Sequence, residues 1–401
     1  MSSVDTATVE AGTGTLAIAK EKQATSIVDT LKAMAAANGG SYKFVSQYMK
    51  VARKPGRMIF DEFVAMRLWD PTLYGSADIR EFLGFYGMRD VFVATNFDFM
   101  AHGLMQNKIA ANAILAEHGL PTIATAAFHS ALGSKGPRKS STPSELAEML
   151  LERLDYPIFC KPLGGLQSLG TASFDSCDRI ARTLLRQDGV VVNADAFAKE
   201  VHNAYGKDGY LIQPRLRPAP ELAAVCGQRT GTVRVLTTLD EGVAKIIRAC
   251  WKIPGGVNSA DNYWRDGNLL ADVNVETGAV GKPITGKGLT YRELDDHPDT
   301  GTRITGMTIP NWQAIRETAL LGAEVMKDFG LVGWDMASNE DGPVIVEMNE
   351  TPDFTLPQMA GRRGIYDADF ADFVKRRQKQ AVISKKAWAA EQKREFGTAF
   401  F

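Results

Sequence analysis

The chain has 401 residues and a formal net charge of −1, so its overall charge gives no basis for binding nucleic acid or an anionic membrane. Hydrophobic residues make up 45% and charged residues 23%, which is typical of a soluble globular protein, and this length allows two or three subdomains. No apolar run approaches transmembrane length, the N-terminus lacks the pattern of a secretory signal, and the four scattered cysteines are typical of reduced thiols. We therefore expect a cytoplasmic protein with small-molecule partners and no nucleic-acid or membrane partner, and we leave a homodimer open.

The N-terminal quarter is predicted to be helical after a loose polar arm at residues 1–25. Residues 26–38 have helical spacing, and a glycine pair follows them. Residues 41–90 are rich in aromatic side chains and predict short helices, the last of which is expected to end at Gly87. We assign residues 1–104 to the arm and a mixed, mainly helical domain.

Residues 105–212 alternate between helical and strand-like segments and predict a first α+β subdomain. Helices are expected at 105–119, 144–154 and 177–187, and strands at 122–128, 156–162, 190–193 and 210–214.

A lysine followed by a glycine-rich turn is the first candidate for ligand chemistry. Lys161 lies on a short apolar strand and precedes the segment LGGLQSLG at 163–170. Glycines let backbone N–H groups close over phosphates. Lys161 would then neutralise phosphate oxygens while Ser168 and Gly170 help to cover them. The lysine precedes the glycines, so this is not a Walker loop, and an ordinary hairpin with a half-exposed lysine is the alternative.

Residues 213–362 predict a second α+β subdomain, and residues 363–401 a charged helical tail. Two β-rich segments are expected within 231–253, a further hairpin at 273–278 and a long amphipathic helix at 310–329. Basic residues alternate with apolar ones in the two β-rich segments. Arg234, Arg248 and Lys252 could face solvent or line an anionic cleft, and Arg234 is the strongest candidate because its neighbours are valines.

The segment 331–354 predicts a β-hairpin with a metal-binding corner. Two apolar runs flank the turn-rich residues 338–342. Folding about this turn brings Asp335 opposite Glu347, and Asn349 shares the face of Glu347 because alternate strand residues point the same way. Two carboxylates and an amide oxygen suit Mg²⁺. The alternative is that all three are solvated polar residues at strand ends, but Glu347 follows a run that looks buried.

Six motifs in sequence order resemble the ATP-grasp superfamily, and most closely its sugar-transfer-associated branch. The motifs carry Asn107–Lys108, Phe159–Pro162, Tyr210–Leu216, Thr232–Val235, Gly333–Asp335 and Val346–Asn349. The resemblance implies an α+β ATP-grasp fold, in which two α+β subdomains sandwich ATP behind a small N-terminal domain. It also implies ATP as cofactor with Mg²⁺, or with Mn²⁺ in its place.

The resemblance further implies a role for each matching residue. Lys108 and Lys161 would bind the α and β phosphates, and the backbone of Gln213, Arg215 and Leu216 would bind adenine. Glu221 would bind the ribose. Arg234 would contact the γ-phosphate or an acyl phosphate, with Lys161 and Lys252 assisting catalysis. The metal ligands would be Asp335, Glu347 and Asn349. Asn107 and Gln213 depart from the acidic residues that many members carry at these positions.

The expected reaction is carboxylate–amine ligation through an acyl phosphate. Such chemistry needs positioning and charge neutralisation rather than a side-chain nucleophile, and the sequence offers no nucleophile set. The alternatives are an ATP-grasp kinase that phosphorylates a hydroxyl and a nucleotide-binding accessory protein of polysaccharide biosynthesis. The substrate is expected to contact the N-terminal domain, the 254–305 region, where Asn262 is one candidate, and residues after Asn349. The latter candidates are Asp353, Gln358, Arg362 and Arg363.

Overall fold

The computed structural model describes residues 27–97, 101, 107–133, 136, 138–164, 169–256, 258 and 260–396. They divide into a smaller unit, within Ile123–Arg215, and a larger unit, within Gln23–Thr122 and Leu216–Phe401. Each unit contains a seven-stranded sheet. The predicted division at residues 104, 212 and 362 stays a prediction.

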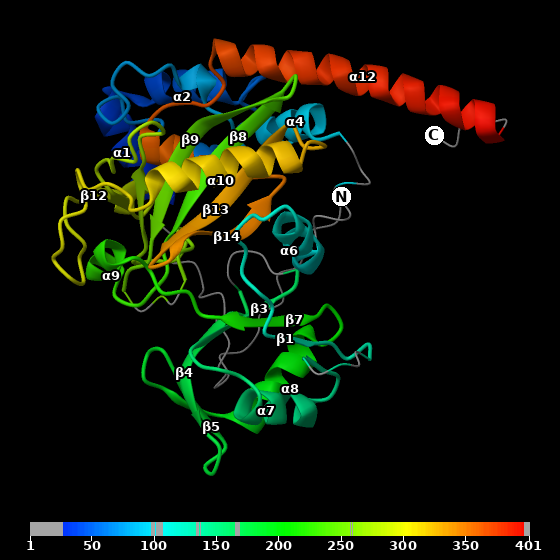
Figure 1. Ribbon diagram of the computed structural model, residues 1–401. Helices are drawn as coiled ribbons and strands as arrows, with labels where there is room; N and C mark the ends of the chain where they lie inside the picture. Colours follow the sequence, from blue (N-terminus) through cyan, green and yellow to red (C-terminus); the bar gives the residue numbers. More distant parts are fainter. Residues whose placement is uncertain are drawn as a thin grey trace. The chain divides into compact units, whose positions relative to one another are not determined.

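The sheet of the smaller unit is mainly antiparallel, in the order β2-β1-β7-β3-β4-β5-β6, and Figure 1 labels five of these strands, β1, β3, β4, β5 and β7. Its strands are β1 (Ala127–His129), β2 (Lys139–Ser140), β3 (Ile158–Pro162), β4 (Ala172–Asp178), β5 (Thr183–Arg186), β6 (Val191–Asn193) and β7 (Tyr210–Pro214). The helices α7 (Pro143–Glu152) and α8 (Ala194–Tyr205) bury one face, where Ile158, Phe174 and Ile212 pack against Leu150 and Phe197. The opposite face carries the candidate ligand residues.

Local sequence signals set the helix starts of this unit. The Thr142 side chain accepts from Glu145 N at 3.2 Å, and the Glu145 carboxylate accepts from Thr142 N at 3.2 Å, so the two residues form a capping box at α7. The helix predicted at 177–187 is wrong. Instead β4 and β5 form a hairpin, in which Leu184 is buried and Ile180 at the turn is 98% exposed. The predicted strand 122–128 is shorter, and only Ala127–His129 pairs as β1.

The sheet of the larger unit has the order β12-β11-β10-β9-β8-β13-β14, and every neighbouring pair is antiparallel. Its strands are β8 (Thr232–Asp240), β9 (Val243–Ile253), β10 (Leu269–Asp272), β11 (Ile284–Thr285), β12 (Arg292–Glu293), β13 (Leu331–Asn339) and β14 (Gly342–Asn349). The hairpins predicted around 240–242 and 338–342 are confirmed. The hairpin predicted at 273–278 is reduced to a single bridge between Val273 and Val280.

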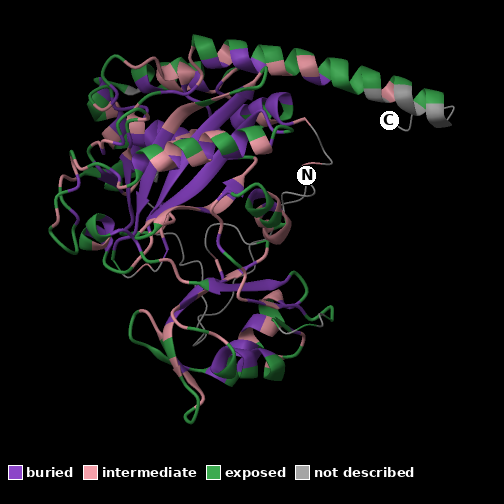
Figure 2. Cartoon of the chain, viewed as in Figure 1, coloured by how far each residue is buried: buried purple, intermediate pink, exposed green. Residues whose placement is uncertain are grey.

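One face of this sheet packs on the long helix α10 (Trp312–Val325), together with α6 (Lys108–Glu117) and α9 (Pro220–Cys226). Trp334 is fully buried there, and a Cβ added to Gly322 of α10 would lie 2.9 Å from its ring. Figure 2 shows the result, with buried strands and an α10 whose outer side is exposed.

The other face is covered by helices from both ends of the chain and by a 3-10 turn from the stretch between β11 and β12. They are α1 (Ile27–Asn38), α2 (Ser41–Val51), α3 (Phe60–Ala65), the 3-10 turns η1 (Ile79–Glu81) and η2 (Gly288–Thr290), α4 (Phe85–Thr95), α11 (Thr355–Gly361) and α12 (Ala368–Phe396). Gly87 lies inside α4 rather than at its end, and a Cβ there would lie 2.3 Å from the Gly56 oxygen, so close approach requires the glycine. The tail is one helix, α12, which packs on α4 before its last turns extend away (Figure 1). Within the described residues no helix has the length and apolar character to cross a membrane.

Candidate functional site

The register of the hairpin β13–β14 aligns the predicted metal ligands. Asp335 pairs with Glu347, and Gly333 pairs with Asn349. Directly opposite residues share a face of an antiparallel sheet, so Asp335, Glu347 and Asn349 lie on one side, as predicted from strand parity. A bulge follows Asp335 and shifts the register beyond it.

The same face continues across the sheet through successive strand pairs. Asp335 pairs with Arg234 of β8, Arg234 with Cys250 of β9, and Cys250 with Asp272 of β10. Lys252, two residues beyond Cys250, points to the same side. We call this side, defined by Asp272, Cys250, Arg234, Asp335 and Glu347, the Asp335 face.

Asp335 is held by two cations. Arg234 donates from Nε to Oδ1 and from Nη2 to Oδ2, both at 2.9 Å, and Lys252 Nζ lies 2.9 Å from Oδ2. All three residues are buried, Asp335 to 4% exposure. Burial alone would raise the pKa of Asp335, but Arg234 and Lys252 outweigh it and hold the pKa below its usual range. Burial would likewise lower the pKa of Arg234, and Asp335 outweighs this and raises it.

A second carboxylate, which sequence reasoning missed, completes this network. Asp261 lies 3.6 Å from Lys252 Nζ and accepts from the backbone N of Thr232 at 2.8 Å and from its hydroxyl. Two buried cations therefore face two carboxylates, which balances their charge. The only sequence signal for Asp261 was an acidic residue in the Gly/Asn-rich segment that follows Lys252.

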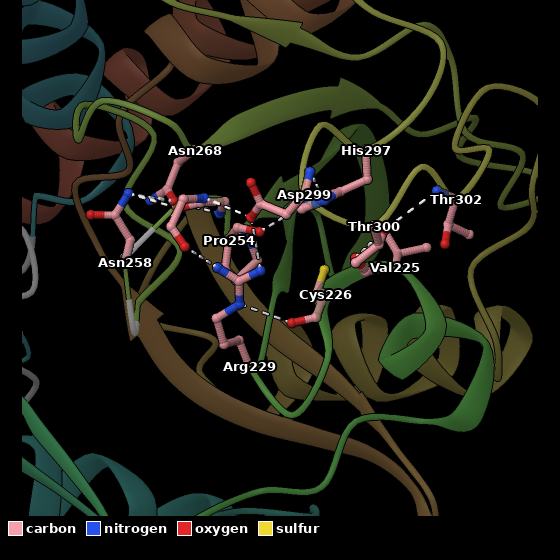
Figure 3. Close-up of polar contacts among 12 residues, drawn as sticks. Val225, Cys226, Arg229, Pro254, Asn258, Asn268, His297, Asp299, Thr300 and Thr302 are labelled. Atoms are coloured by element: carbon pink, nitrogen blue, oxygen red, sulfur yellow. Dashed lines mark hydrogen bonds and ion pairs between the residues drawn. The ribbon is translucent and has the colours of Figure 1, made fainter. Parts of the chain in front are cut away.

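Polar contacts fasten the loop that follows β9 (Figure 3). Arg229 donates to the Gly256 oxygen at 2.8 Å and pairs with Asp299 at 3.2 Å, while Gly256 N donates to Asp299 at 2.8 Å. His297 Nε2 contacts the Pro254 oxygen at 2.9 Å, and its Nδ1 accepts from Asp299 N at 3.2 Å. These bonds hold Pro254 and Gly256, which closely follow Lys252, to Arg229 and to the segment that carries His297 and Asp299.

Glu347 has a cation of its own. Lys108 Nζ lies 3.1 Å from Glu347 Oε1, and the Glu347 side chain is about one-third exposed, at 33%. Lys108 opens α6, whose first turn is capped by the Asn107 side chain, which accepts from Ile109 N at 3.0 Å and from Ala110 N at 3.3 Å. Asn107 therefore caps the helix although many family members carry an acidic residue at this position.

The residues fit a divalent cation in part. Glu347 and Asn349 offer hard oxygen atoms, and the Asn349 amide nitrogen makes only a long contact of 3.5 Å with the Gly333 oxygen. Both oxygens of Asp335 already accept from Arg234 or Lys252, so a metal contact there would be shared with these two cations. In the part of the chain that the structure describes, no group of three His, Cys, Asp or Glu residues is placed to hold a metal by itself.

In the smaller unit, the face opposite α7 and α8 carries Lys161 and Gln213. Lys161 pairs with Leu211 and Phe159 with Gln213, so both candidates share this face. Gln213 is 1% exposed, and its Nε2 makes a long bond of 3.4 Å to the Ile123 oxygen. Its Oε1 is buried and has no hydrogen-bond partner among the described residues. A buried acceptor left open on this face fits a ligand with an amino group, such as adenine.

The other residues predicted to bind nucleotide differ in their surroundings. Arg215 pairs with Asp175, and its backbone N donates to the Pro157 oxygen at 2.9 Å. A Cβ on Gly170 would clash with Tyr205, so its glycine is already required for packing. Leu216 is half-buried after β7, Glu221 is exposed in the first turn of α9, and Ser168 lies outside the described residues. Their ligand roles stay predictions.

Three expected substrate contacts are occupied within the fold. Gln358 is buried, accepts from Leu83 N at 2.8 Å and donates to the Leu83 oxygen at 2.9 Å, so it joins α11 to the N-terminal segment. The Asp353 side chain accepts from Thr355 N at 2.8 Å at the start of α11, and the Asn262 side chain accepts from Trp264 N at 3.1 Å. Gln358 is therefore a structural residue rather than an exposed recognition residue.

The sequence model of the sugar-transfer associated ATP-grasp family matches residues 88–371. The chain belongs to this family. Its fold is thus the α+β ATP-grasp fold that the motifs predicted, and the match includes every candidate site residue in both units. The ATP-grasp match begins within α4 and ends within α12, so α1 to α3 lie outside it.

Solved structures give distant likenesses to this ATP-grasp protein. D-alanine--D-alanine ligase from Bacillus anthracis is 12% identical with a TM-score of 0.40, and the match covers 72% of each chain. Biotin carboxylase from Campylobacter jejuni is 12% identical with a TM-score of 0.43, covering 74% of this chain and 53% of that one. L-amino acid ligase from Bacillus licheniformis is 12% identical with a TM-score of 0.37, covering 69% and 49%. No curated protein matches the chain.

Proposed function

We propose that this ATP-grasp protein is an ATP-dependent ligase that joins a carboxylate to an amine on a small molecule. The observation that carries the proposal is the buried Asp335 network, in which Arg234 and Lys252 are fixed beside Glu347 on one face of a sheet. Fixed cations stabilise charge that develops during phosphoryl and acyl transfer without reorganising at the moment of reaction.

The proposed reaction has two steps. A substrate carboxylate oxygen attacks the γ-phosphorus of ATP, the bond from that phosphorus to the β–γ bridging oxygen breaks, and ADP leaves. An amine nitrogen then attacks the acyl carbon, the carbon–oxygen bond to phosphate breaks, and the amine loses a proton as the amide forms. Neither step needs a covalent enzyme intermediate. Burial raises the pKa of the Cys250 thiol on this face to about 12, so it stays protonated and is not a nucleophile.

Residue roles follow from placement and from the family. Arg234 and Lys252 would neutralise the transferred phosphate, with Lys108 and Lys161 on the other phosphates. Gln213 would receive the adenine amino group, and Glu221 the ribose. Mg²⁺, when bound, would neutralise phosphate charge, and it would be held by Glu347 and Asn349, with Asp335 as the third ligand of the predicted set.

Two alternatives keep the same nucleotide residues. A kinase would transfer the γ-phosphate to a hydroxyl, and an accessory protein would bind nucleotide without turnover. The Arg234–Lys252 pair is fixed by Asp335 on the face that also carries Glu347, and this preorganised arrangement of charges favours chemistry over binding alone.

The test is ADP release from full-length protein with ATP and Mg²⁺, screened over pairs of amino acids, sugar acids and amines. Hydroxylamine is then added in place of the amine. We expect a hydroxamate, and we expect Glu347→Gln to abolish ADP release while the fold is retained. ADP release with a phosphorylated hydroxyl product and no hydroxamate would establish the kinase instead. Turnover by Glu347→Gln at the wild-type rate would contradict the site itself.

A further inference from the structure

A cavity on the N-terminal helices is lined mainly by cations. It encloses about 430 Å³ and lies where α2, the turn that follows it and η1 meet. We call it the Arg53 cavity, and its polar lining consists of Ser46, Lys50, Arg53, Lys54 and Arg80. None of these residues belongs to the candidate site, and all of them precede the stretch that the family model matches. The cavity is therefore a feature separate from the ATP-grasp site.

The cations that line the cavity have little counter-charge. Residues 41–60 contain five lysines and arginines and no aspartate or glutamate. Lys50, Arg53 and Lys54 form no ion pair with any residue that the structure describes, whereas Arg80 Nη2 lies 2.6 Å from Asp78 Oδ2. No carboxylate is among the lining residues. The cavity is thus a concentration of positive charge in a protein whose overall charge is close to zero.

Counting the nearby carboxylates still leaves an excess of positive charge. Hydrogen bonds to Asp78 raise the pKa of Arg80, and the charge of Glu81 adds to this effect. The same hydrogen bonds lower the pKa of Asp78, and the charge of Lys50 lowers it further. Four lining cations therefore stand against two carboxylates. The C-terminal end of α2 contributes only about half a negative charge, so the excess remains.

Local backbone contacts fix the turn that carries Arg53 and Lys54. The backbone N of Arg57 donates to the Arg53 oxygen at 2.9 Å. A Cβ on Gly56 would lie 2.3 Å from the Val51 oxygen, so glycine is required for the turn to close this tightly on α2. Because this backbone is already ordered, a ligand that binds the two side chains loses less binding energy to conformational entropy.

Arg80 is held in position on η1. Its backbone N donates to Asp78 Oδ1 at 2.9 Å, and its Nε and Nη2 donate to Asp78 Oδ2 at 2.9 and 2.6 Å. Its Nη1 makes no hydrogen bond with a described residue and remains available to a ligand. The guanidinium and ammonium groups of the lining are donors only, and the Ser46 hydroxyl can also donate. This combination of donors and excess positive charge suits an anion with several oxygen atoms.

A phosphate monoester matches both the charge and the size of the cavity. It carries about two negative charges at pH 7 and three terminal oxygens, which can accept from two guanidinium groups and a lysine together. A carboxylate has one charge and two oxygens. The volume of about 430 Å³ is that of a small-molecule site, so there is room for an organic part as well. Met49 and Pro55 complete the lining and offer apolar contacts to that part.

We propose that the Arg53 cavity binds a phosphate monoester, with the phosphate on Arg53, Lys54 and Arg80. Soluble sugar and glycerol phosphates share this group with the headgroup of phosphatidate. Tyr42 and Val45 of α2 are 86% and 47% exposed, which gives a lipid bilayer an apolar surface to contact beside the cavity. The site does not rest on the proposed ligase reaction.

The probe is glycerol 3-phosphate, titrated calorimetrically into the full chain without nucleotide, with glycerol and succinate as comparators. We expect a dissociation constant below about 1 mM for the ester and much weaker binding of both comparators. Arg53→Gln with Lys54→Gln should weaken binding about tenfold or more, because charge-assisted hydrogen bonds are lost. Lys50→Gln should also weaken binding, and it carries the test if the double variant does not fold.

Two controls separate the cavity from other binding sites. Lys385→Gln with Lys386→Gln removes the same two charges from exposed positions of α12, and Lys161→Gln alters the nucleotide candidate. Both should bind the ester as wild type does. Unchanged binding in Arg53→Gln with Lys54→Gln would overturn the proposal. Equal weakening in the α12 control would also overturn it, since it would indicate a general charge effect. So would loss of binding in Lys161→Gln, or binding of glycerol or succinate as tightly as the ester.

Sedimentation with vesicles distinguishes the two sources of the ester. Vesicles of phosphatidylcholine with phosphatidate are compared with vesicles of phosphatidylcholine alone. Sedimentation with phosphatidate only, lost in Arg53→Gln with Lys54→Gln, would assign the cavity to a lipid headgroup. Binding of glycerol 3-phosphate without sedimentation would assign it to a soluble ester. Neither sedimentation nor binding of glycerol 3-phosphate would overturn the proposal.

Discussion

The Asp335 network makes a quantitative prediction about stability. In Asp335→Asn, Arg234 loses both of its charged bonds of 2.9 Å and Lys252 keeps only Asp261 at 3.6 Å. Removing one partner of a buried ion pair leaves an uncompensated charge and costs about 3–5 kcal/mol. Glu347→Gln removes a pair with Lys108 in which Glu347 is 33% exposed, so it should cost no more than about 1 kcal/mol.

The assay is urea unfolding followed by tryptophan fluorescence. All six tryptophans lie in the sequence ranges of the larger unit, so this signal reports that unit alone. We expect the midpoint to fall strongly in Asp335→Asn with an unchanged slope, and hardly at all in Glu347→Gln. Replacing Arg234 as well, in Arg234→Met with Asp335→Asn, should recover about 1–3 kcal/mol because the stranded cation is gone. Wild-type stability in Asp335→Asn would refute the network.

Three further outcomes test the same structure. The pKa of Asp335 lies below its usual 3.8 in the fold, so its contribution is full above about pH 4 and is lost on acidification below it; wild type should lose stability there while Asp335→Asn changes less. Gly322→Ala places a methyl 2.9 Å from the Trp334 ring and should cost about 1–3 kcal/mol in thermal unfolding, whereas an unchanged melting temperature would contradict this packing. Gln358→Ala strands both backbone groups of Leu83 and should cost about 2–4 kcal/mol; reduced substrate affinity at wild-type stability would instead restore it as a recognition residue.

The two-residue period of the strands predicted more of the site geometry than any single motif did. The pairing of Asp335 with Glu347 follows from the turn and the two-residue period alone, and the structure confirms it. Strand parity could not predict which side chain on the neighbouring strand forms an ion pair with Asp335. Arg234 was expected to contact a phosphate, and in the fold it bonds to Asp335. This contact arises because β8 lies beside β13, and that strand order depends on the tertiary structure.

The errors in secondary structure have similar causes. Residues 177–187 contain helix-compatible side chains, but pairing of β5 with β4 and β6 decides their conformation. Gly87 looked like a helix end, yet the approach of Gly56 explains the glycine and the helix continues to Thr95. The ATP-grasp assignment survived these errors because it rested on the order of short polar motifs, which do not depend on where helices end.

The division of the chain into units has a consequence for the order of folding. The described residues of the smaller unit form one continuous stretch, so all of its sheet has been synthesised once residue 215 emerges from the ribosome. The larger unit cannot complete its fold at that point, because it needs residues that are synthesised later. Asn96 bonds to the backbone of Leu331 at 2.7 and 2.9 Å and to the Glu350 oxygen at 2.6 Å, contacts that join positions more than 230 residues apart. Its N-terminal helices must therefore wait through the synthesis of an entire inserted unit, and such distant contacts are slow to form and expose apolar surface meanwhile. We expect nascent chains of this protein to acquire protease resistance first in the smaller unit and to depend on chaperones for the larger one.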